Sequence, residues 1–205
     1  SGLAGTGSND IRVDNVFVAD HRMLDTMQLK GGPTPGSAVN EGYLYRLPLF
    51  GAFSFNLIGV VMGIARGAAN RIIESLREQT SAGGVKLAMS QSVQLRVAEA
   101  LAEIDAAYAL VFRNRDEIVR MAKAGQVPEL IDRARYRRDN GFAASLCVRA
   151  VDRLMPLLGG RGLAIDHPVQ RAWRDIHAVA QHIALTWDVQ GAINGATVNA
   201  DGGST

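Results

Sequence analysis

The sequence predicts a mainly α-helical chain, an antiparallel up-and-down four-helix bundle preceded by a short β segment. Three observations support this prediction. Apolar residues recur at helical spacing from residue 48 onward, the first 30 residues instead carry β-branched residues in partial alternation, and the connections between the helical stretches are short. Because short loops force consecutive long helices to reverse direction, four such helices favour an antiparallel bundle.

The first 30 residues differ in pattern from all that follow. A Gly/Ser/Thr-rich stretch at 1–10 precedes four β-branched residues, and these are Ile11, Val13, Val16 and Val18. Two strands alone bury too little surface to be stable in water. We therefore expect residues 1–30 to be the end of a β domain whose beginning is missing.

The segment 31–47 contains GGPTPGS, a composition that indicates a linker. Residues 48–190 then carry the expected bundle. The stretch 191–205 is rich in Gly, Asn and Ser and is expected to be a flexible, frayed tail. The sequence thus predicts four segments in order, of which only the bundle has a core of its own.

Three long helices are expected before the last one. The first begins after Pro48 and should fray by residues 83–84, which are both glycine. Ser90 can cap a second helix that ends at 124–125, where a glycine follows an alanine. The third covers about 128–158, with Pro156 shortening its final turn.

The fourth expected helix, residues 167–188, holds three of the four histidines and both tryptophans. Pro168 suits a first helical position, with Asp166 or His167 as the capping residue before it. Arg171 and Asp175 stand at the favourable i, i+4 spacing of an ion pair. This helix is the stretch in which we expect chemistry.

At 3.6 residues per turn, His182 would share an apolar stripe with Ala178 and Leu185. A lone histidine on such a face is either a hydrogen-bonded core residue or a catalytic group, and spacing alone leaves both open. His177 lies five positions away, which defeats the i, i+4 spacing of a helical metal pair. We therefore expect no metal site.

The composition of the chain argues against some classes of binding partner. The net charge is +2, with 22 Lys+Arg against 20 Asp+Glu, and no polybasic stripe argues for nucleic acid. We see no run of roughly 20 apolar residues and no signal-peptide pattern, so no membrane association and a cytoplasmic location are expected. The single cysteine, Cys147, lies in a helical apolar pattern that favours core packing.

Three polar motifs each allow two interpretations. The arginines at 133, 135, 137 and 138 indicate a solvated helix face or an ion-paired subunit contact, or else an anion site. GTGSND at 5–10 lacks the GK[ST] ending of a phosphate loop and favours a simple turn. GGRG at 159–162 precedes a helix, so it is either a glycine C-cap and turn or a phosphate-binding loop.

Three stretches together resemble a known family. They are GLAGTGSNDIRVDNVFVADHR at 2–22, SVQLRVAEALAEIDAAY at 92–108 and HPVQRAWRDIHAVAQHIALTWD at 167–188. In this order, and over nearly the whole chain, they are similar to the two-component flavin-dependent monooxygenases of the acyl-CoA dehydrogenase fold. The last stretch is the most specific of the three.

The resemblance implies a protein about twice this length, with a helical and a β domain before the bundle. Members take reduced flavin, usually FMN with FAD as the alternative, from a separate flavin reductase. In these enzymes the reduced flavin reacts with O2 to form a C4a-hydroperoxide, which hydroxylates an aromatic or other small substrate. Members are typically homotetramers. The isolated chain should therefore bind flavin weakly or not at all, because part of the pocket is missing.

The resemblance also assigns site residues. His182 matches the family histidine at the reactive edge of the flavin, where it would hydrogen-bond the reacting group and help deprotonate a phenol. Arg77 resembles the arginine that binds the flavin phosphate. Gly159, Gly160 and Arg161 resemble the loop that contacts the cofactor.

Two alternatives remain. A true acyl-CoA dehydrogenase needs a glutamate base, but residues 180–186 contain no carboxylate and Ile183 stands about where that base would fall. The third possibility is a bundle that mediates only assembly. The substrate and the choice between FMN and FAD are not determined by the sequence.

Overall fold

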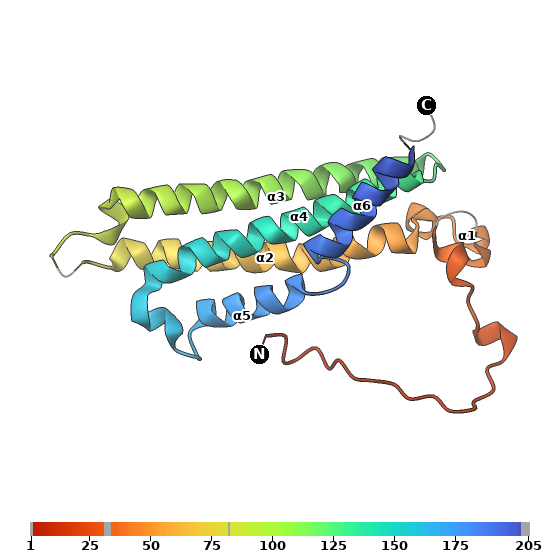
Figure 1. The fold of residues 1–205 in the computed structure, drawn as a ribbon, viewed down its shortest axis with the longest axis horizontal. Coiled ribbons are helices and arrows are strands. Elements are labelled where there is room, and N and C mark those ends of the chain that lie inside the picture. The colour runs from red at the N-terminus through yellow and green to blue at the C-terminus, as the bar shows by residue number, and fades with distance from the viewer. Residues whose placement is uncertain (1, 31–33, 82, 202–205) are drawn as a thin grey trace.

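In the computed structural model, which describes residues 2–30, 34–81 and 83–201, the chain is mainly helical (Figure 1). Residues 31–33 of the expected linker and 202–205 of the expected tail lie outside the described residues. The helices, in chain order, are α1 (Pro35–Val39), α2 (Leu49–Glu78), α3 (Gln91–Lys123), α4 (Leu130–Leu154), α5 (Pro168–Ala180) and α6 (Trp187–Asp201), with five 3-10 turns, η1 (Asp20–Arg22), η2 (Thr26–Lys30), η3 (Tyr43–Arg46), η4 (Leu87–Met89) and η5 (Met155–Leu163).

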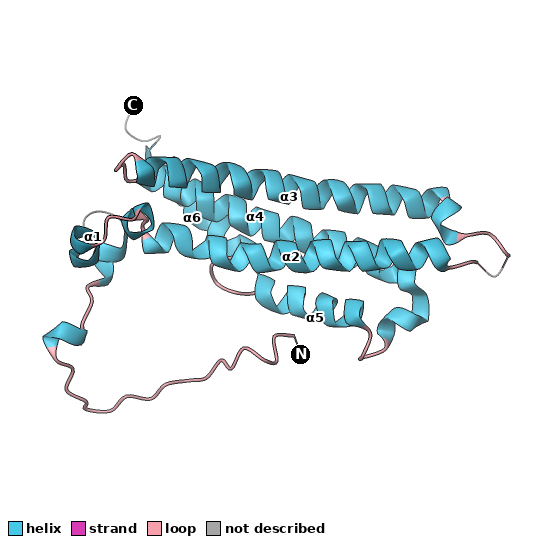
Figure 2. Ribbon diagram, turned by 180° about the vertical axis from the view of Figure 1, so that it is seen from behind, coloured by secondary structure: helices cyan, strands magenta, loops and turns pink. Residues whose placement is uncertain are grey.

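The helix α4 is the centre of the arrangement, because it contacts α2, α3, α5 and α6. Figures 1 and 2 show α2, α3 and α4 running lengthwise beside one another, with the shorter α5 along α2 and with α6 across α4. Fully buried apolar side chains from α2, α3 and α5, among them Ile72, Ile104 and Ile176, pack toward this centre. Each contributes about 1.5–3 kcal/mol by leaving water.

The expected helix limits are confirmed for the first three long helices. Gly125 ends α3 with a φ of 71°, a conformation that glycine adopts without strain. Ser90 occupies the N-cap position of α3 as expected, but its hydroxyl makes no capping hydrogen bond. At α5, His167 is the capping residue, since its Nδ1 accepts the amide hydrogen of Val169, and Pro168 is the first helical residue.

The prediction of one continuous helix over 167–188 was wrong. The helix α5 ends at Ala180, residues 181–186 form a turn, and α6 begins at Trp187. The carbonyl oxygen of His182 accepts hydrogen bonds from the backbone amides of Leu185 and Thr186 and from the Thr186 hydroxyl. These short-range bonds close the turn and redirect the chain. The expected frayed tail is instead helical as far as Asp201.

The expected β segment is also corrected, because the described residues contain no β-strand. A strand needs a partner to accept its backbone hydrogen bonds, and residues 10–19 pass no strand in the described chain. Their side chains are open to solvent, with Ile11 88% and Phe17 90% exposed. Both ends of the segment contact the bundle, since the Leu3 amide donates to Asp175 Oδ1 on α5 at 2.7 Å and η2 contacts α2.

The helix α2 is long and apolar enough to cross a membrane by length and composition alone, a feature that the sequence expectation overlooked. Its buried face nevertheless packs against α3, α4 and α5. Within the described residues this packing buries 33% of the apolar stretch of α2, and a single helix that qualifies by length and composition alone is weak evidence for a membrane span.

Candidate active site

The predicted catalytic residue, His182, lies in the exposed turn between α5 and α6 rather than on an apolar helix face. Its Nδ1 accepts the backbone amide hydrogen of Ala184 at 3.1 Å. In the neutral imidazole, this bond leaves the hydrogen on Nε2. The turn therefore presents one ring nitrogen outward as a hydrogen-bond donor.

The surroundings of His182 are apolar and partly open. Its ring lies 6.1 Å from the ring of Phe53 on α2. The next residue, Ile183, is 68% exposed, and Trp187 at the start of α6 makes a tilted ring contact with Phe142 on α4, with the centroids 5.6 Å apart. The turn thus places an exposed imidazole beside one aromatic ring of α2, and His182 lines none of the main pockets formed by the described residues.

A second, polar hollow of about 460 Å³ lies at the other end of α5. It is formed by Arg161 from the predicted loop, by His167 at the cap of α5, and by Glu78 and Thr80 at the end of α2. Gly159 has φ 60° and ψ −154°, a conformation essentially restricted to glycine. Both Gly159 and Gly160 face open space, so their backbone is accessible.

Arg77 is exposed in the last turn of α2. It directly precedes Glu78, which lines the hollow, but Arg77 itself does not line the hollow. The structure therefore brings Arg161 and the end of α2 together, and leaves Arg77 beside them. His182 lies beyond the opposite end of α5, a 13-residue helix that spans about 20 Å. The predicted residues accordingly form two separate clusters in this chain.

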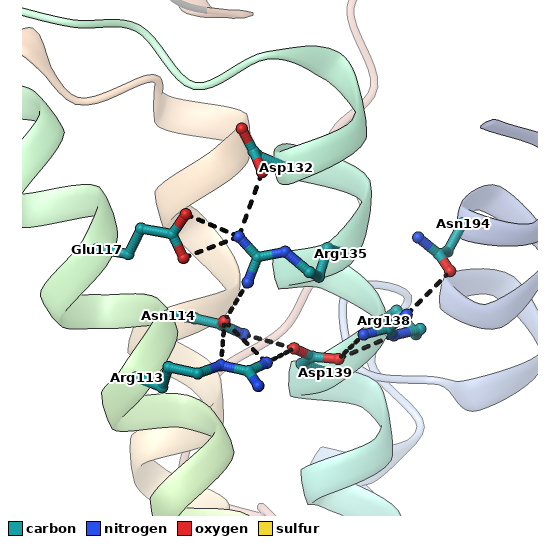
Figure 3. A network of polar contacts seen from close by, with 8 residues as sticks. All are labelled: Arg113, Asn114, Glu117, Asp132, Arg135, Arg138, Asp139 and Asn194. Atoms are coloured by element: carbon teal, nitrogen blue, oxygen red, sulfur yellow. Dashed lines mark hydrogen bonds and ion pairs between the residues drawn. The ribbon is translucent and has the colours of Figure 1, made fainter. Parts of the chain in front are cut away.

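The arginine cluster on α4 makes contacts within the chain (Figure 3). Arg135 pairs with Glu117 at 2.8 Å and with Asp132 at 3.2 Å, and Arg138 pairs with Asp139 at 2.7 Å. Hydrogen bonding to its two carboxylates raises the pKa of Arg135 against the opposing effect of burial. Arg135 and Arg138 are therefore ion-paired within the chain, whereas the expected ion-paired subunit contact stays a prediction.

The sequence alone did not reveal a cluster around Asp152 on α4. Its Oδ1 accepts the Trp173 indole hydrogen at 2.7 Å and lies 2.9 Å from His177 Nε2. A signal was available, because Trp173 and His177 stand at i, i+4 on one face of α5. The cluster joins α4 to α5 and lines none of the hollows described above.

The chain is similar to flavin-dependent enzymes. The family described as Acyl-CoA dehydrogenase, C-terminal domain, matches residues 57–187. The FADH(2)-dependent resorcinol hydroxylase, oxygenase component, of Rhizobium sp. (strain MTP-10005) is 37% identical over 205 residues, 95% of this chain and 50% of that protein. This chain therefore spans about half the length of this relative.

Solved structures agree with this relationship. The crystal structure of 3-HSA hydroxylase from Rhodococcus sp. RHA1 is similar with a TM-score of 0.87 and 30% identity, over 97% of this chain and 52% of that one. XiaF from Streptomyces sp., in complex with FADH2 and glycerol, has a TM-score of 0.80 and 25% identity, over 90% of this chain and 47% of that one. Because the family match extends over most of the helical core, the chain belongs to the acyl-CoA dehydrogenase C-terminal domain family.

Proposed function

We propose that this chain is the C-terminal part of the oxygenase component of a two-component monooxygenase that uses reduced flavin to hydroxylate an aromatic substrate. The observation that carries the proposal is the His182 turn, where an exposed imidazole lies 6.1 Å from the ring of Phe53 and its Nδ1 is held by the Ala184 amide. The relatives named as hydroxylases support the reaction type. The remainder of the pocket would come from the domains that precede the bundle.

His182 would act through Nε2, because Nδ1 is already bonded to the Ala184 amide. In this role the neutral imidazole donates its Nε2 hydrogen to the reacting group or to a phenolate oxygen. It can take a phenolic proton at Nε2 only after the hydrogen moves to Nδ1, which requires the bond from the Ala184 amide to open. The flavin supplies the activation of O2 when it is bound. No carboxylate lies within residues 180–186, which argues against the α-proton abstraction of a dehydrogenase.

The polar hollow at the other end of α5 fits a flavin phosphate in part. The Arg161 guanidinium and the N-terminus of α5 at His167 border the hollow and favour an anion, whereas the exposed Gly159 and Gly160 precede Arg161 in the loop without lining the hollow. The Glu78 carboxylate in the same hollow opposes one. Arg77 is the nearby cation that could offset this charge, and we retain it as a phosphate ligand in the proposal.

The cofactor and assembly are part of the same proposal. We favour reduced FMN delivered by a flavin reductase, in a cytoplasmic homotetramer. The names of two relatives contain FADH2 instead, so FMN and FAD must be compared directly. Because His182 and Arg161 lie about 20 Å apart along one chain, the two clusters can serve one flavin only if it is long or if two subunits contribute.

The test uses the full-length protein with a flavin reductase, NADH, air and a panel of phenols. Hydroxylated product and H2O2 are measured per O2 consumed, with FMN and FAD in parallel. The His182→Ala variant should lose at least about tenfold in product yield while H2O2 rises, since one general acid–base group contributes about 10²–10⁴-fold. His177→Ala on α5 is the matched control. Equal product yields in His182→Ala and wild type would contradict the proposal.

A further inference from the structure

The turn that carries His182 is anchored by one buried amide side chain, that of Gln190 on α6. Gln190 is 0% exposed. Its Nε2 donates a hydrogen bond to the carbonyl oxygen of Ile183, the residue next to His182. Its Oε1 accepts from Arg137 Nε on α4 at 2.8 Å. A continuous chain of hydrogen bonds thus joins α4 to the turn through α6.

The orientation of this amide is fixed by the chemistry of its partners. A guanidinium can only donate and a backbone carbonyl can only accept, so Gln190 can satisfy both in one orientation only. The charge of Arg137 polarises the amide and strengthens its donation to Ile183. The turn is therefore held by a charge-assisted bond and not by an isolated neutral one.

A glycine on α4 makes room for this contact. A Cβ added to Gly141 would lie 3.1 Å from Gln190 Cβ and 3.2 Å from the Leu185 carbonyl oxygen, tighter than ordinary contact. Leu185, the turn residue above it, is itself 1% exposed. Gly141 therefore lets both the anchor and the turn pack directly on the α4 backbone.

We propose that Gln190 is a positioning residue for His182, held by Arg137 and accommodated by Gly141, and that it sets the imidazole geometry required for hydroxylation. The claim that Gln190 affects hydroxylation rests on the proposed function. The claim that Gln190 holds the turn concerns only the position of His182. A displacement of that turn by about 1 Å is expected to lower kcat roughly 10- to 100-fold.

The first experiment measures the chemical accessibility of His182 in the turn and requires no enzymatic activity. Diethyl pyrocarbonate modifies neutral imidazole nitrogens, and its rate at each histidine of the full-length protein is followed by peptide mass spectrometry. Gln190→Glu keeps the acceptor for Arg137 but removes the donor to Ile183. We expect its His182 to react several-fold faster as Nδ1 loses the Ala184 amide, while His167, tied to α5, keeps its rate.

The second experiment measures the kinetics of hydroxylation. Gln190→Glu should lower kcat by roughly 10- to 100-fold with little change in substrate KM. In a His182→Ala background, the same substitution should have no further effect on hydroxylation, since both changes remove one function. Gly141→Ala should act in the same direction. Gly195→Ala, on α6 with nothing within 4 Å of the added Cβ, is the matched control.

The outcomes separate the two proposals. An unchanged His182 modification rate in both Gln190→Glu and Gly141→Ala would overturn the positioning role. Additive losses of kcat in the double variant would also overturn it. A changed modification rate together with full hydroxylation by His182→Ala would support the anchor and reject the catalytic part, so the failure would belong to the proposed function.

Discussion

The side-chain amide of Asn114 on α3 donates to Asp139 Oδ2 on α4 at 2.9 Å, and both residues are buried within the bundle. The same carboxylate also accepts from Arg113 at 2.6 Å and from Arg138 at 2.7 Å (Figure 3). A buried charge is tolerated only when its hydrogen-bonding capacity is filled. Asp139 therefore sets the pairing of α3 with α4.

The Asp139→Asn substitution should destabilise the bundle by about 1–3 kcal/mol, because an amide hydrogen would then face the donors on Asn114 or the arginines. The loss is limited because Arg113 and Arg138 are partly exposed, so that solvent screens their charges. Urea unfolding followed by circular dichroism measures the effect. Asp116→Asn, which breaks an exposed pair with Arg115, should change stability by no more than about 0.5 kcal/mol.

Stability should fall at alkaline pH because of two buried groups. Burial raises the pKa of Cys147 and the pKa of Tyr136 each to about 12. The unfolded chain releases these protons from pH 9.0 and 10.0, the ordinary values, whereas the folded chain retains them. Their contribution is complete below pH 9.0 and is lost as pH rises toward about 12.

The measurement is the free energy of unfolding between about pH 8 and 11, a range in which reversibility must be verified. Cys147→Ala should flatten the lower part of the slope and Tyr136→Phe the upper part. Parallel slopes in wild type and in both variants would show that other groups control the alkaline transition.

The Cys147 thiol should be inert in the folded protein. It is 0% exposed, and its raised pKa leaves almost no thiolate at neutral pH. Dithionitrobenzoate should titrate it only after denaturant is added, as a single thiol of this chain. Rapid reaction of the native protein would mean that α4 opens locally on the time scale of the assay.

Two neighbouring glycines should respond differently to alanine. A Cβ on Gly162 would lie 2.8 Å from Leu158 Cβ, so Gly162→Ala should destabilise the fold by about 1–3 kcal/mol. Gly160 has nothing within 4 Å, and Gly160→Ala should leave the thermal midpoint unchanged. Similar midpoints for the two variants would contradict the close packing of Gly162 on Leu158 within η5.

Arg161→Ala should weaken flavin binding by roughly tenfold or more, which is the value of one charge-assisted hydrogen bond to phosphate. The fluorescence quenching of added FMN and FAD by the full-length protein gives both dissociation constants. Riboflavin, which lacks a phosphate, is the ligand control and should bind wild type and variant equally. Equal FMN affinity in both proteins would remove Arg161 from the site.

The sequence by itself determined the first three long helices and the start of the fourth. These limits depend on local chemistry, such as Pro168 at a first helical position and Gly125 at a positive φ, and such effects act over a few residues. The Arg171–Asp175 pair at 3.6 Å and the buried Cys147 follow from helical periodicity in the same way.

Only the tertiary structure decided where the fourth helix breaks and where His182 points. The pattern over 167–188 remains helical, but Gln190 and Gly141 draw the turn against α4, and contacts between residues so far apart leave no periodic signal. Similarly, the alternating residues of 1–30 cannot form strands without a partner strand in the described chain. Local sequence therefore set the helices, and contacts distant in sequence set the site.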